Sequence, residues 1–342
     1  MSKVYVGMSG GVDSSLTAAL LVEAGHDVTG VYMKNWTQDL PGMRCPWADD
    51  LADAKRVAVH LGIDFKVFDF EKDYKQKVVD YMIDEYTAGR TPNPDIMCNQ
   101  EIKFKLFLET ALEDGANYVA TGHYARTKDG ELLLAEDANK DQTYFLYRVT
   151  KQALQKTLFP LGGYTKPEVR KMAEERGLVT ANKKDSVGIC FVGQIGMREF
   201  LSQYVATKPG DIIDTQTGKV LGRHDGAIYY TLGQRHGLDV GGGLPYYVVS
   251  KDMTKNEVYV STDLNNENLW AKQIKLESVH FIAGESYVGL CQVRIRHRAP
   301  LIDAEISKDG VIALANAERA ITPGQSVVIY SGDVCLGGGI VV

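Results

Sequence analysis

The sequence has few cysteines and lacks any long apolar run. Its 342 residues include 5 cysteines, an odd number that argues against a disulfide framework and for thiols that are kept reduced or used chemically. No apolar segment is long enough to span a bilayer, and the start shows no basic stretch followed by an apolar one. We therefore expect a cytoplasmic protein with no membrane association.

The chain also lacks an excess of positive charge. Its formal net charge is −6, which argues against nonspecific nucleic-acid binding over the whole surface. Residues 272–342 nevertheless hold seven lysines and arginines against seven acidic residues, so the deficit lies upstream and a local basic patch there stays open. Hydrophobic residues at 44% and charged residues at 24% are ordinary for a globular protein, and the length predicts two or three domains.

Two common nucleotide-binding motifs are absent as well. No Gly-x-x-x-x-Gly-Lys-Ser/Thr run occurs, and the glycines near the start do not have the spacing of the dinucleotide fingerprint. What is present is an apolar run over 4–8, a loop with Gly10 and Gly11, and helical spacing over 14–24. Such a loop lets backbone N–H groups close on an anion at the positive end of a helix. The pattern predicts a phosphate cradle; the alternative is an ordinary βα turn that binds nothing.

Side chains of this loop favour a magnesium-bound nucleotide. Ser9, Ser14 and Ser15 add hydroxyl donors, and Asp13 fits beside phosphates only if a metal lies between them. The segment 9–14 resembles the pyrophosphate loop of N-type ATP pyrophosphatases. This resemblance implies that ATP is split between its α and β phosphates and that an oxygen is activated as an adenylate.

Alternating strand and helix patterns predict the fold. Strands are expected over 27–33, 65–70 and 118–121, and helices over 48–61 and 74–87. The predicted architecture is an α/β catalytic domain over 1–203 with a doubly wound parallel sheet, a small antiparallel β-rich central domain over 204–271, and a C-terminal antiparallel β-barrel or sandwich over 272–342. Residues 227–231 are expected to form one strand of the central domain.

Two cysteines lie in segments that suggest chemistry. Two X-Pro steps at Pro92 and Pro94 indicate extended backbone, and Asn99 is expected to cap the helix that follows, which would put Cys98 just before a helix N-terminus. The positive field there would favour a thiolate, although a cysteine is more commonly a small buried residue. Cys190 has glycines on both sides and lysines upstream, which is weaker support for a second reactive thiol.

Histidine and arginine positions leave alternatives open. His123 follows the strand expected over 118–121, at the edge where parallel sheets bind ligands, but it could equally be a structural histidine. Arg294, Arg296 and Arg298 alternate along an expected strand. They could form a ladder for a nucleic-acid backbone or pair across the sheet with acidic residues at 303 or 305.

Seven motifs in order resemble those of the tRNA-specific 2-thiouridylases, a bacterial family that thiolates the wobble uridine of certain tRNAs. They cover the segments 7–14, 90–99, 120–125, 140–144, 188–191, 230–235 and 319–325, so the resemblance extends over nearly the whole chain.

The resemblance implies roles for matching residues. ATP would be held by Gly7, Met8, Ser9, Gly10, Gly11, Val12, Asp13, Ser14, Met33 and Gly122. The target base would be surrounded by Asn93, Pro94 and Asp95, and tRNA would be contacted by His123, Lys140, Asp141, Gln142, Arg296, His297 and Gln325. Cys190 would carry a persulfide delivered by a sulfur-relay protein, Cys98 would be the second catalytic thiol, and Asp95 would assist proton movement.

The implied reaction activates the uracil carbonyl oxygen with ATP and Mg²⁺ and then replaces it with sulfur. Sulfur would attack either as the persulfide on Cys190 or as hydrosulfide released by Cys98, and both routes end in a disulfide that needs a reductant. The target base would flip out of the single-stranded anticodon loop. We predict no resident metal centre. The alternatives are a pyrophosphatase-type ligase that acts on a small-molecule carbonyl or carboxylate, and an RNA-binding protein without chemistry.

Overall fold

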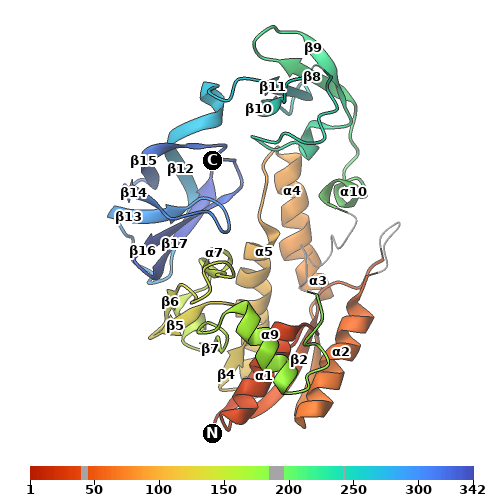
Figure 1. Cartoon of the computed structure of the whole chain (residues 1–342), viewed down its shortest axis with the longest axis vertical. Helices are drawn as coiled ribbons and strands as arrows, with labels where there is room; N and C mark the ends of the chain where they lie inside the picture. Colours follow the sequence, from red (N-terminus) through yellow and green to blue (C-terminus); the bar gives the residue numbers. More distant parts are fainter. Residues whose placement is uncertain (40–44, 185–195, 242) are drawn as a thin grey trace.

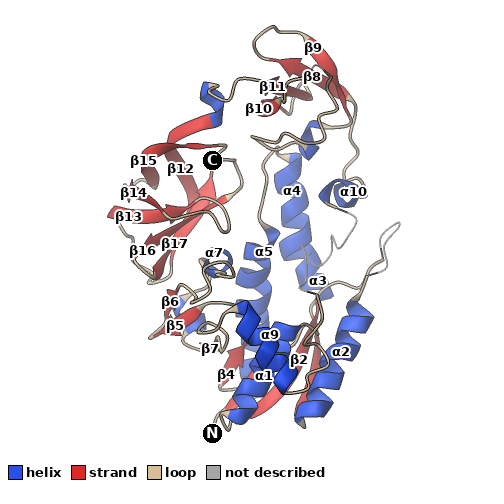
Figure 2. Cartoon of the chain, viewed as in Figure 1, coloured by secondary structure: helices blue, strands red, loops and turns tan. Residues whose placement is uncertain are grey.

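The computed structural model describes residues 1–39, 45–184, 196–241 and 243–342. Figure 1 shows three bodies: a parallel sheet with helices near the N-terminus, a small sheet at the far end of the molecule, and a barrel that contains the C-terminus. Figure 2 shows that nearly all of the helices belong to the first body. Among the described residues, no helix is both long and apolar enough to cross a bilayer.

The first body is built on a five-stranded parallel sheet, as the α/β prediction expected. Its strands are β1 (Lys3–Gly7), β2 (Asp27–Lys34), β3 (Asp64–Asp69), β4 (Tyr118–Ala120) and β7 (Thr157–Leu158). They are ordered β3-β2-β1-β4-β7, and each neighbouring pair is parallel. Val4, Tyr5 and Val6 of the central strand are fully buried, because helices cover both faces of the sheet.

Two apolar cores lie on the two faces of this sheet. The helices are α1 (Val12–Glu23), α2 (Trp47–Leu61), α3 (Glu71–Tyr74), α4 (Tyr81–Thr87), α5 (Pro94–Met97), α6 (Phe107–Glu113), α7 (Thr143–Leu146), α8 (Lys151–Leu154), α9 (Lys166–Glu175) and α10 (Met197–Leu201). One core contains Leu16 of α1, Val57 of α2 and Val169 of α9. The other contains Met82 of α4 and Phe107 of α6. This doubly wound arrangement confirms the predicted fold class.

Two of the helices contain wide π-helical turns. The segment η1 (Lys75–Asp80) joins α3 to α4, and η2 (Cys98–Leu106) joins α5 to α6. The expectation that Asn99 caps a helix is wrong, because the helix already begins at Pro94 with Asn93 at its N-cap. Proline constrains the residue before it and is favoured at the first helical position, so Pro94 starts the helix instead of delaying it.

The small sheet is mixed, not antiparallel as expected. Its strands are β8 (Gly210–Asp214), β9 (Val220–His224), β10 (Tyr247–Asp252) and β11 (Glu257–Ser261), in the order β10-β11-β8-β9. Strands β11 and β8 pair in parallel, which the long connection between them permits. The strand expected over 227–231 is instead the single 3₁₀ turn η3 (Ala227–Tyr229).

The C-terminal body is a closed antiparallel barrel, as one of the two predicted forms. Its strands are β12 (Trp270–Phe281), which follows the 3₁₀ turn η4 (Glu267–Leu269), then β13 (Gly289–Arg294), β14 (Ile302–Ile306), β15 (Val311–Arg319), β16 (Ser326–Ser331) and β17 (Val334–Val341). Pairing of β12 with both β15 and β17 closes the ring. A hairpin from the first body, β5 (Arg126–Lys128) and β6 (Glu131–Leu133), extends the sheet beside β17.

The arginines do not form the predicted ladder along one strand. The alternative, in which they pair across the sheet with acidic residues at 303 or 305, is also wrong for Arg294. Strand β13 ends at Arg294, and Arg298 has a left-handed φ of 64°, so the three arginines do not alternate along one strand. The side chain of Arg294 is buried and contacts Asp141 at 2.7 Å instead of an acidic residue on β14. The chain turns after β13, which separates Arg296 and Arg298 from the strand register.

The Asp141–Arg294 pair belongs to a buried polar seam between the first body and the barrel. Asp141 also accepts hydrogen bonds from Thr143 Oγ1 at 2.7 Å and from the Ala135 backbone N–H at 3.0 Å. Tyr144 donates its hydroxyl to the Ser326 carbonyl at 2.9 Å, and the Arg294 guanidinium lies over the Tyr330 ring. Apart from Arg294 Nε, which has no hydrogen-bond partner among the described residues, these groups satisfy one another away from water, so the seam fixes how the barrel sits on the first body.

Removing one member of this pair should leave a buried uncompensated charge. We expect Arg294→Met to lower the free energy of unfolding by about 3–5 kcal/mol in urea titrations. The matched control is Arg223→Met, because Arg223 forms an exposed pair with Asp211 at 3.5 Å and should contribute less than about 1 kcal/mol. Equal effects of the two substitutions would contradict a stabilising seam.

A desolvated lysine lies in the small sheet. Lys251 of β10 donates its Nζ to the Tyr230 carbonyl at 2.7 Å. Burial lowers the pKa of Lys251 to about 8, because the ammonium loses its hydration. In the unfolded chain a lysine titrates near pH 10.4, so the unfolded chain binds more protons than the folded one between about pH 8 and about pH 10.4. The contribution of Lys251 to stability therefore rises with pH through that window.

We expect the free energy of unfolding of Lys251→Met to exceed that of the wild type most at neutral pH, because the wild type carries the desolvated ammonium there. The difference in unfolding free energy should shrink by up to about 3 kcal/mol between pH 8 and 10, as followed by urea unfolding at several pH values. Lys308→Met, which removes an exposed lysine, should give a difference that does not vary with pH. A gap between Lys251→Met and wild type that is constant over the window would refute this assignment.

Candidate active site

The loop between β1 and α1 has the geometry of an anion cradle. Gly11 is the N-cap of α1, with φ of −96° and ψ of 166°, and has no side chain with which to cap the first helical N–H groups. Gly10 has a left-handed φ of 74°, and a Cβ there would lie 2.3 Å from the Asp50 carbonyl oxygen. Only glycine fits at position 10, and the free N–H groups of the helix start are available to phosphate oxygens.

Serine hydroxyls brace the loop from inside. Ser14 Oγ accepts from the Ser9 backbone N–H at 3.2 Å, lies 3.3 Å from Ser9 Oγ, and donates to the Gly11 carbonyl at 3.1 Å. Ser15 Oγ donates to the same carbonyl at 2.8 Å. Ser9 is exposed, whereas Val12 and Met8 are buried beneath the loop. The loop is therefore held in shape by its own side chains.

The residues predicted for ATP come together at the carboxyl ends of β1, β2 and β4. A Cβ on Gly122 would lie 2.8 Å from both the Asp13 carbonyl carbon and the Ser14 backbone nitrogen. A Cβ on Gly7 would lie 2.9 Å from the Met33 Cε. The segment after β4 thus touches the cradle directly, and the end of β2 touches the end of β1 just before it, at the edge where open parallel sheets bind ligands.

Asp13 has partners that the sequence did not indicate. Both of its carboxylate oxygens accept from Lys166 Nζ, at 2.7 and 2.9 Å, and Oδ1 also accepts from the Tyr124 hydroxyl at 2.8 Å. Lys166 is 8% exposed and begins α9, whose Thr165–Glu168 capping box holds that helix start. A lysine at a helix start is usually solvated, so no local pattern could have marked it.

A second lysine lies on the other side of the cradle. Lys183 contacts Asp50 at 2.7 Å and Asp53 at 2.6 Å, both on α2, and Asp50 supplies the carbonyl that approaches Gly10. The ammonium of Lys183 holds the pKa of the Asp53 carboxyl below its usual range. Lys166 and Lys183 therefore place ammonium groups beside the cradle, each paired with one or more carboxylates that offset its charge.

The predicted catalytic residues Asp95 and Cys98 lie in the first turns of the helix that starts at Pro94. Cys98 is buried, one turn inside the helix rather than just before it, so the predicted N-terminal placement is corrected. Asp95 is partly buried, and this burial raises the pKa of its carboxyl, while the nearby Lys103 ammonium opposes the rise. Cys190 lies outside the described residues.

His123 is packed in the protein interior. Its Nδ1 lies 2.8 Å from Thr121 Oγ1, and its ring contacts those of Phe104 and Phe159. Burial lowers the pKa of His123 well below its usual value, and the Lys103 charge acts in the same direction. Lys103 thus influences both Asp95 and His123, which links the Pro94 helix to the loop after β4. No sequence pattern marks Lys103 as functional, because a lysine at this position fits an ordinary helix.

The residues predicted to contact tRNA divide into two groups. Asp141 and His123 are buried, and Gln142 Oε1 accepts from the Tyr124 backbone N–H at 2.9 Å. Lys140 is partly buried, and the ring of His297 lies 4.5 Å from that of Phe145. Arg296 and Gln325 instead line a cavity of about 460 Å³. RNA contacts by the buried members stay predictions, and those members also have clear structural partners.

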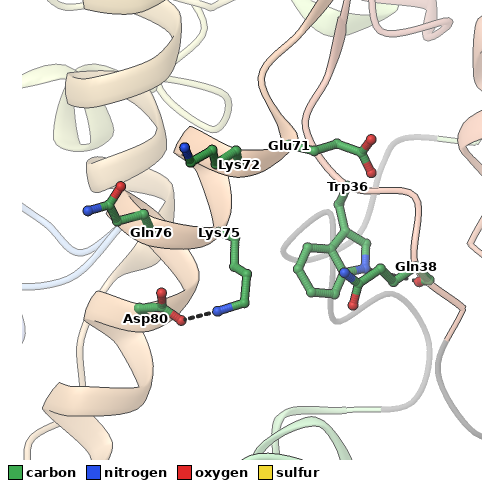
Figure 3. A pocket seen from close by; sticks show the side chains of 7 residues that line it. All are labelled: Trp36, Gln38, Glu71, Lys72, Lys75, Gln76 and Asp80. Atoms are coloured by element: carbon green, nitrogen blue, oxygen red, sulfur yellow. Dashed lines mark hydrogen bonds and ion pairs between the residues drawn. The ribbon is translucent and has the colours of Figure 1, made fainter.

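A cavity of about 570 Å³ lies beyond the end of β2. Its lining residues are Trp36, Gln38, Glu71, Lys72, Lys75, Gln76 and Asp80 (Figure 3). Lys75 and Asp80 form an ion pair at 2.8 Å on its wall. Within the described part of the chain, no residue predicted for ATP or tRNA lines this cavity, so we do not assign it to the site.

The close approach of Gly122 to the cradle gives a test. We expect Gly122→Ala to weaken ATP binding at least about tenfold in calorimetric titrations with Mg²⁺, because the backbone at residues 13 and 14 must shift. Gly163→Ala is the matched control, since a Cβ at Gly163 meets no described atom within 4 Å. Wild-type ATP affinity in Gly122→Ala would show that the cradle does not bind ATP.

Family models match the chain in three consecutive ranges. Their descriptions are "tRNA methyl transferase HUP domain" for residues 2–194, "tRNA methyl transferase PRC-barrel domain" for 198–262, and "Aminomethyltransferase beta-barrel domain" for 271–341. The solved structure of NMN synthetase from Francisella tularensis also aligns, at 16% identity and a TM-score of 0.37 over 56% of this chain and 68% of that chain, which is too weak for residues to be transferred.

Curated relatives match over almost the full length. The tRNA-specific 2-thiouridylase MnmA of Listeria innocua is 48% identical over 350 residues, which cover 99% of this chain and 94% of the relative. The protein of the same name from Geobacillus thermodenitrificans is 49% identical, with 99% of this chain and 94% of the relative covered. Identity at this level through the cradle, the Pro94 helix and the barrel shows that the chain belongs to the tRNA-specific 2-thiouridylase family.

Proposed function

We propose that this protein transfers sulfur to C2 of the wobble uridine of tRNA in a reaction that consumes ATP. The observation that carries the proposal is how three segments are linked. The cradle at 9–14 touches the loop at 121–124 through Gly122, and the helix that starts at Pro94 packs its Phe104 ring against His123 of that loop. The first suits a triphosphate, and the last brings a carboxyl and a thiol to the same region. Membership of the tRNA-specific 2-thiouridylase family supports tRNA as the substrate.

The first step is adenylation. The uracil O2 is a poor leaving group, so it attacks the α-phosphate of ATP and pyrophosphate leaves. The N–H groups at the start of α1 and the Lys166 ammonium would stabilise the charge on the phosphates. Mg²⁺, when bound with ATP, would neutralise further phosphate charge. Asp13 is the carboxylate of the cradle that would share with it, once a phosphate oxygen draws away Lys166, which now contacts both Asp13 oxygens.

The second step replaces the activated oxygen with sulfur. The terminal sulfur of a persulfide on Cys190 attacks C2 and AMP leaves, after which Cys98 attacks the Cys190 sulfur and frees the thiolated base. In the other route Cys98 first releases hydrosulfide from the persulfide, and hydrosulfide attacks C2. Both routes leave a Cys98–Cys190 disulfide, so a reductant and a sulfur-relay donor are required. Asp95, whose burial raises the pKa of its carboxyl, is suited to hold or release a proton.

The tRNA would enter with its anticodon loop over the Pro94 helix and the barrel. We propose that Asn93, Pro94 and Asp95 surround the flipped base and that Arg296, His297 and Gln325 contact RNA from the barrel. The exposed Arg296 and the contact of Gln325 Nε2 with the Thr91 carbonyl at 2.7 Å support this path. Asp141 would act indirectly, by holding Arg294 and with it the barrel. The dependence on a reductant favours the cytoplasm as the compartment.

The decisive measurement is pyrophosphate release and thiolated product with unmodified tRNA added or withheld. We expect release to require tRNA, and Cys98→Ser and Cys190→Ser to abolish thiolated product while adenylation can survive the Cys190 change. Cys291→Ser, in the barrel core, is the matched control and should keep product formation.

Other outcomes select the alternatives. Pyrophosphate release that is indifferent to tRNA and to both cysteines would indicate a small-molecule ligase. Binding of ATP and tRNA with no pyrophosphate release would indicate an RNA-binding protein without chemistry. Either result overturns the proposed function.

A further inference from the structure

A polar cavity lies between the small sheet and the barrel. Its volume is about 460 Å³, and its polar side chains come from Thr231, Gln234, Arg296, Arg319, Thr322 and Gln325. We name it the two-arginine cavity after Arg296 and Arg319. No carboxylate is among the described residues that line it. A hollow with two guanidinium groups and neutral polar groups favours an anionic ligand.

Arg319 is the residue in this cavity that lacks partners. Its Nε and Nη2 atoms are buried and have no hydrogen-bond partner among the described residues. The guanidinium lies over the Tyr247 ring, 4.6 Å from its centroid, which fixes its plane. A buried charge without hydrogen bonds is unfavourable, so this arrangement is expected where a ligand supplies the missing acceptors.

The backbone around Arg319 is held tightly in place. Ala320 has a left-handed φ of 55°, and a Cβ on Gly233 would lie 2.6 Å from the Ala320 Cβ. Arg296 Nη2 donates to the carbonyls of both Arg319 and Ala320. The turn at 231–234 and the end of β15 are therefore locked together, so the cavity is preformed.

The cavity adjoins the segment that leads to the catalytic helix. The Thr91 backbone N–H donates to the Pro323 carbonyl at 2.9 Å, and the Thr91 carbonyl accepts from Gln325 Nε2 at 2.7 Å. Thr91 Oγ1 also lies 3.2 Å from Thr231 Oγ1. Thr91 thus contacts both walls of the cavity and stands two residues before Asn93. A polynucleotide whose base reaches 93–95 would carry its backbone past the cavity.

We propose that the two-arginine cavity binds a backbone phosphate of the tRNA next to the target nucleotide and that Arg319 is the residue that contacts it. This inference rests on the proposed function and adds a binding residue to it. The planar guanidinium would donate to the phosphate, and because its Nε–H and Nη2–H are covered in the free protein, this edge would have to turn toward the cavity when the phosphate binds. ATP is not the expected ligand, because its phosphates fit the cradle at α1.

The test is the salt dependence of binding of unmodified tRNA. Loss of one phosphate contact should reduce the slope of log K against log salt by about 0.7–0.9. We expect this reduction, with a weaker Kd at low salt, for Arg319→Gln. Arg319→Lys should keep the slope, because it keeps the charge. Its affinity should lie between those of Arg319→Gln and the wild type, because lysine lacks the planar guanidinium with its two parallel N–H donors. Arg223→Gln, which removes an exposed arginine of β9, should leave both quantities unchanged.

Several results would overturn the inference. An Arg319→Gln variant with the slope and Kd of Arg223→Gln would show that Arg319 makes no contact. A weaker Kd with an unchanged slope would indicate a base contact instead of a phosphate. If the affinity for ATP or inorganic pyrophosphate fell in the absence of tRNA, the cavity would belong to the nucleotide. Failure of the wild type to bind tRNA would instead contradict the proposed function. If Arg319→Gln fails the thermal unfolding check, Arg319→Met removes the same charge and takes its place in the comparison.

Discussion

The buried contact between Asp141 and Arg294 is the constraint on which the relation between the two large bodies depends. Each charge needs the other, because neither side chain reaches water and Asp141 accepts two further hydrogen bonds. The pair places the barrel so that Gln325 reaches the backbone of Thr91. The proposed RNA-binding residues of the barrel and the proposed reacting residues of the first body are far apart in the sequence. The buried seam holds the two bodies at a fixed distance from each other.

The phosphate cradle depends on a different constraint, the close approach of backbones. Gly10 lies against the α2 backbone and Gly122 against the start of α1, and neither contact admits a Cβ. Such contacts require glycine, but no local sequence pattern reveals them because the two backbones come from distant segments. The sequence showed the loop because a short apolar strand, two glycines and a helical run are local signals. The barrel was predicted for the same reason, since strand alternation is recognised over a few residues.

The features that could not be predicted are long-range ones. Lys166 and Asp13 are separated by more than a hundred residues, and nothing near either of them in the sequence marks the pair. The parallel pairing of β11 with β8 depends on how a long connection folds back. The start of the Pro94 helix was misjudged for a local reason: proline restricts its predecessor but also starts helices, and the second effect prevailed once Ile96 and Ile102 could be buried.

The distribution of charge gives the site its selectivity. Both substrates of the proposed reaction are polyanions, yet the chain has a net charge of −6. Positively charged side chains are therefore placed locally, with Arg296 and Arg319 at the cavity and with Lys166 and Lys183 beside the cradle, where they contact Asp13, Asp50 and Asp53. An acidic surface repels RNA in general, so binding must gain its energy at these few positions. RNA that satisfies the cavity while presenting a base at Asp95 would bind, and RNA that does only one of these would be repelled.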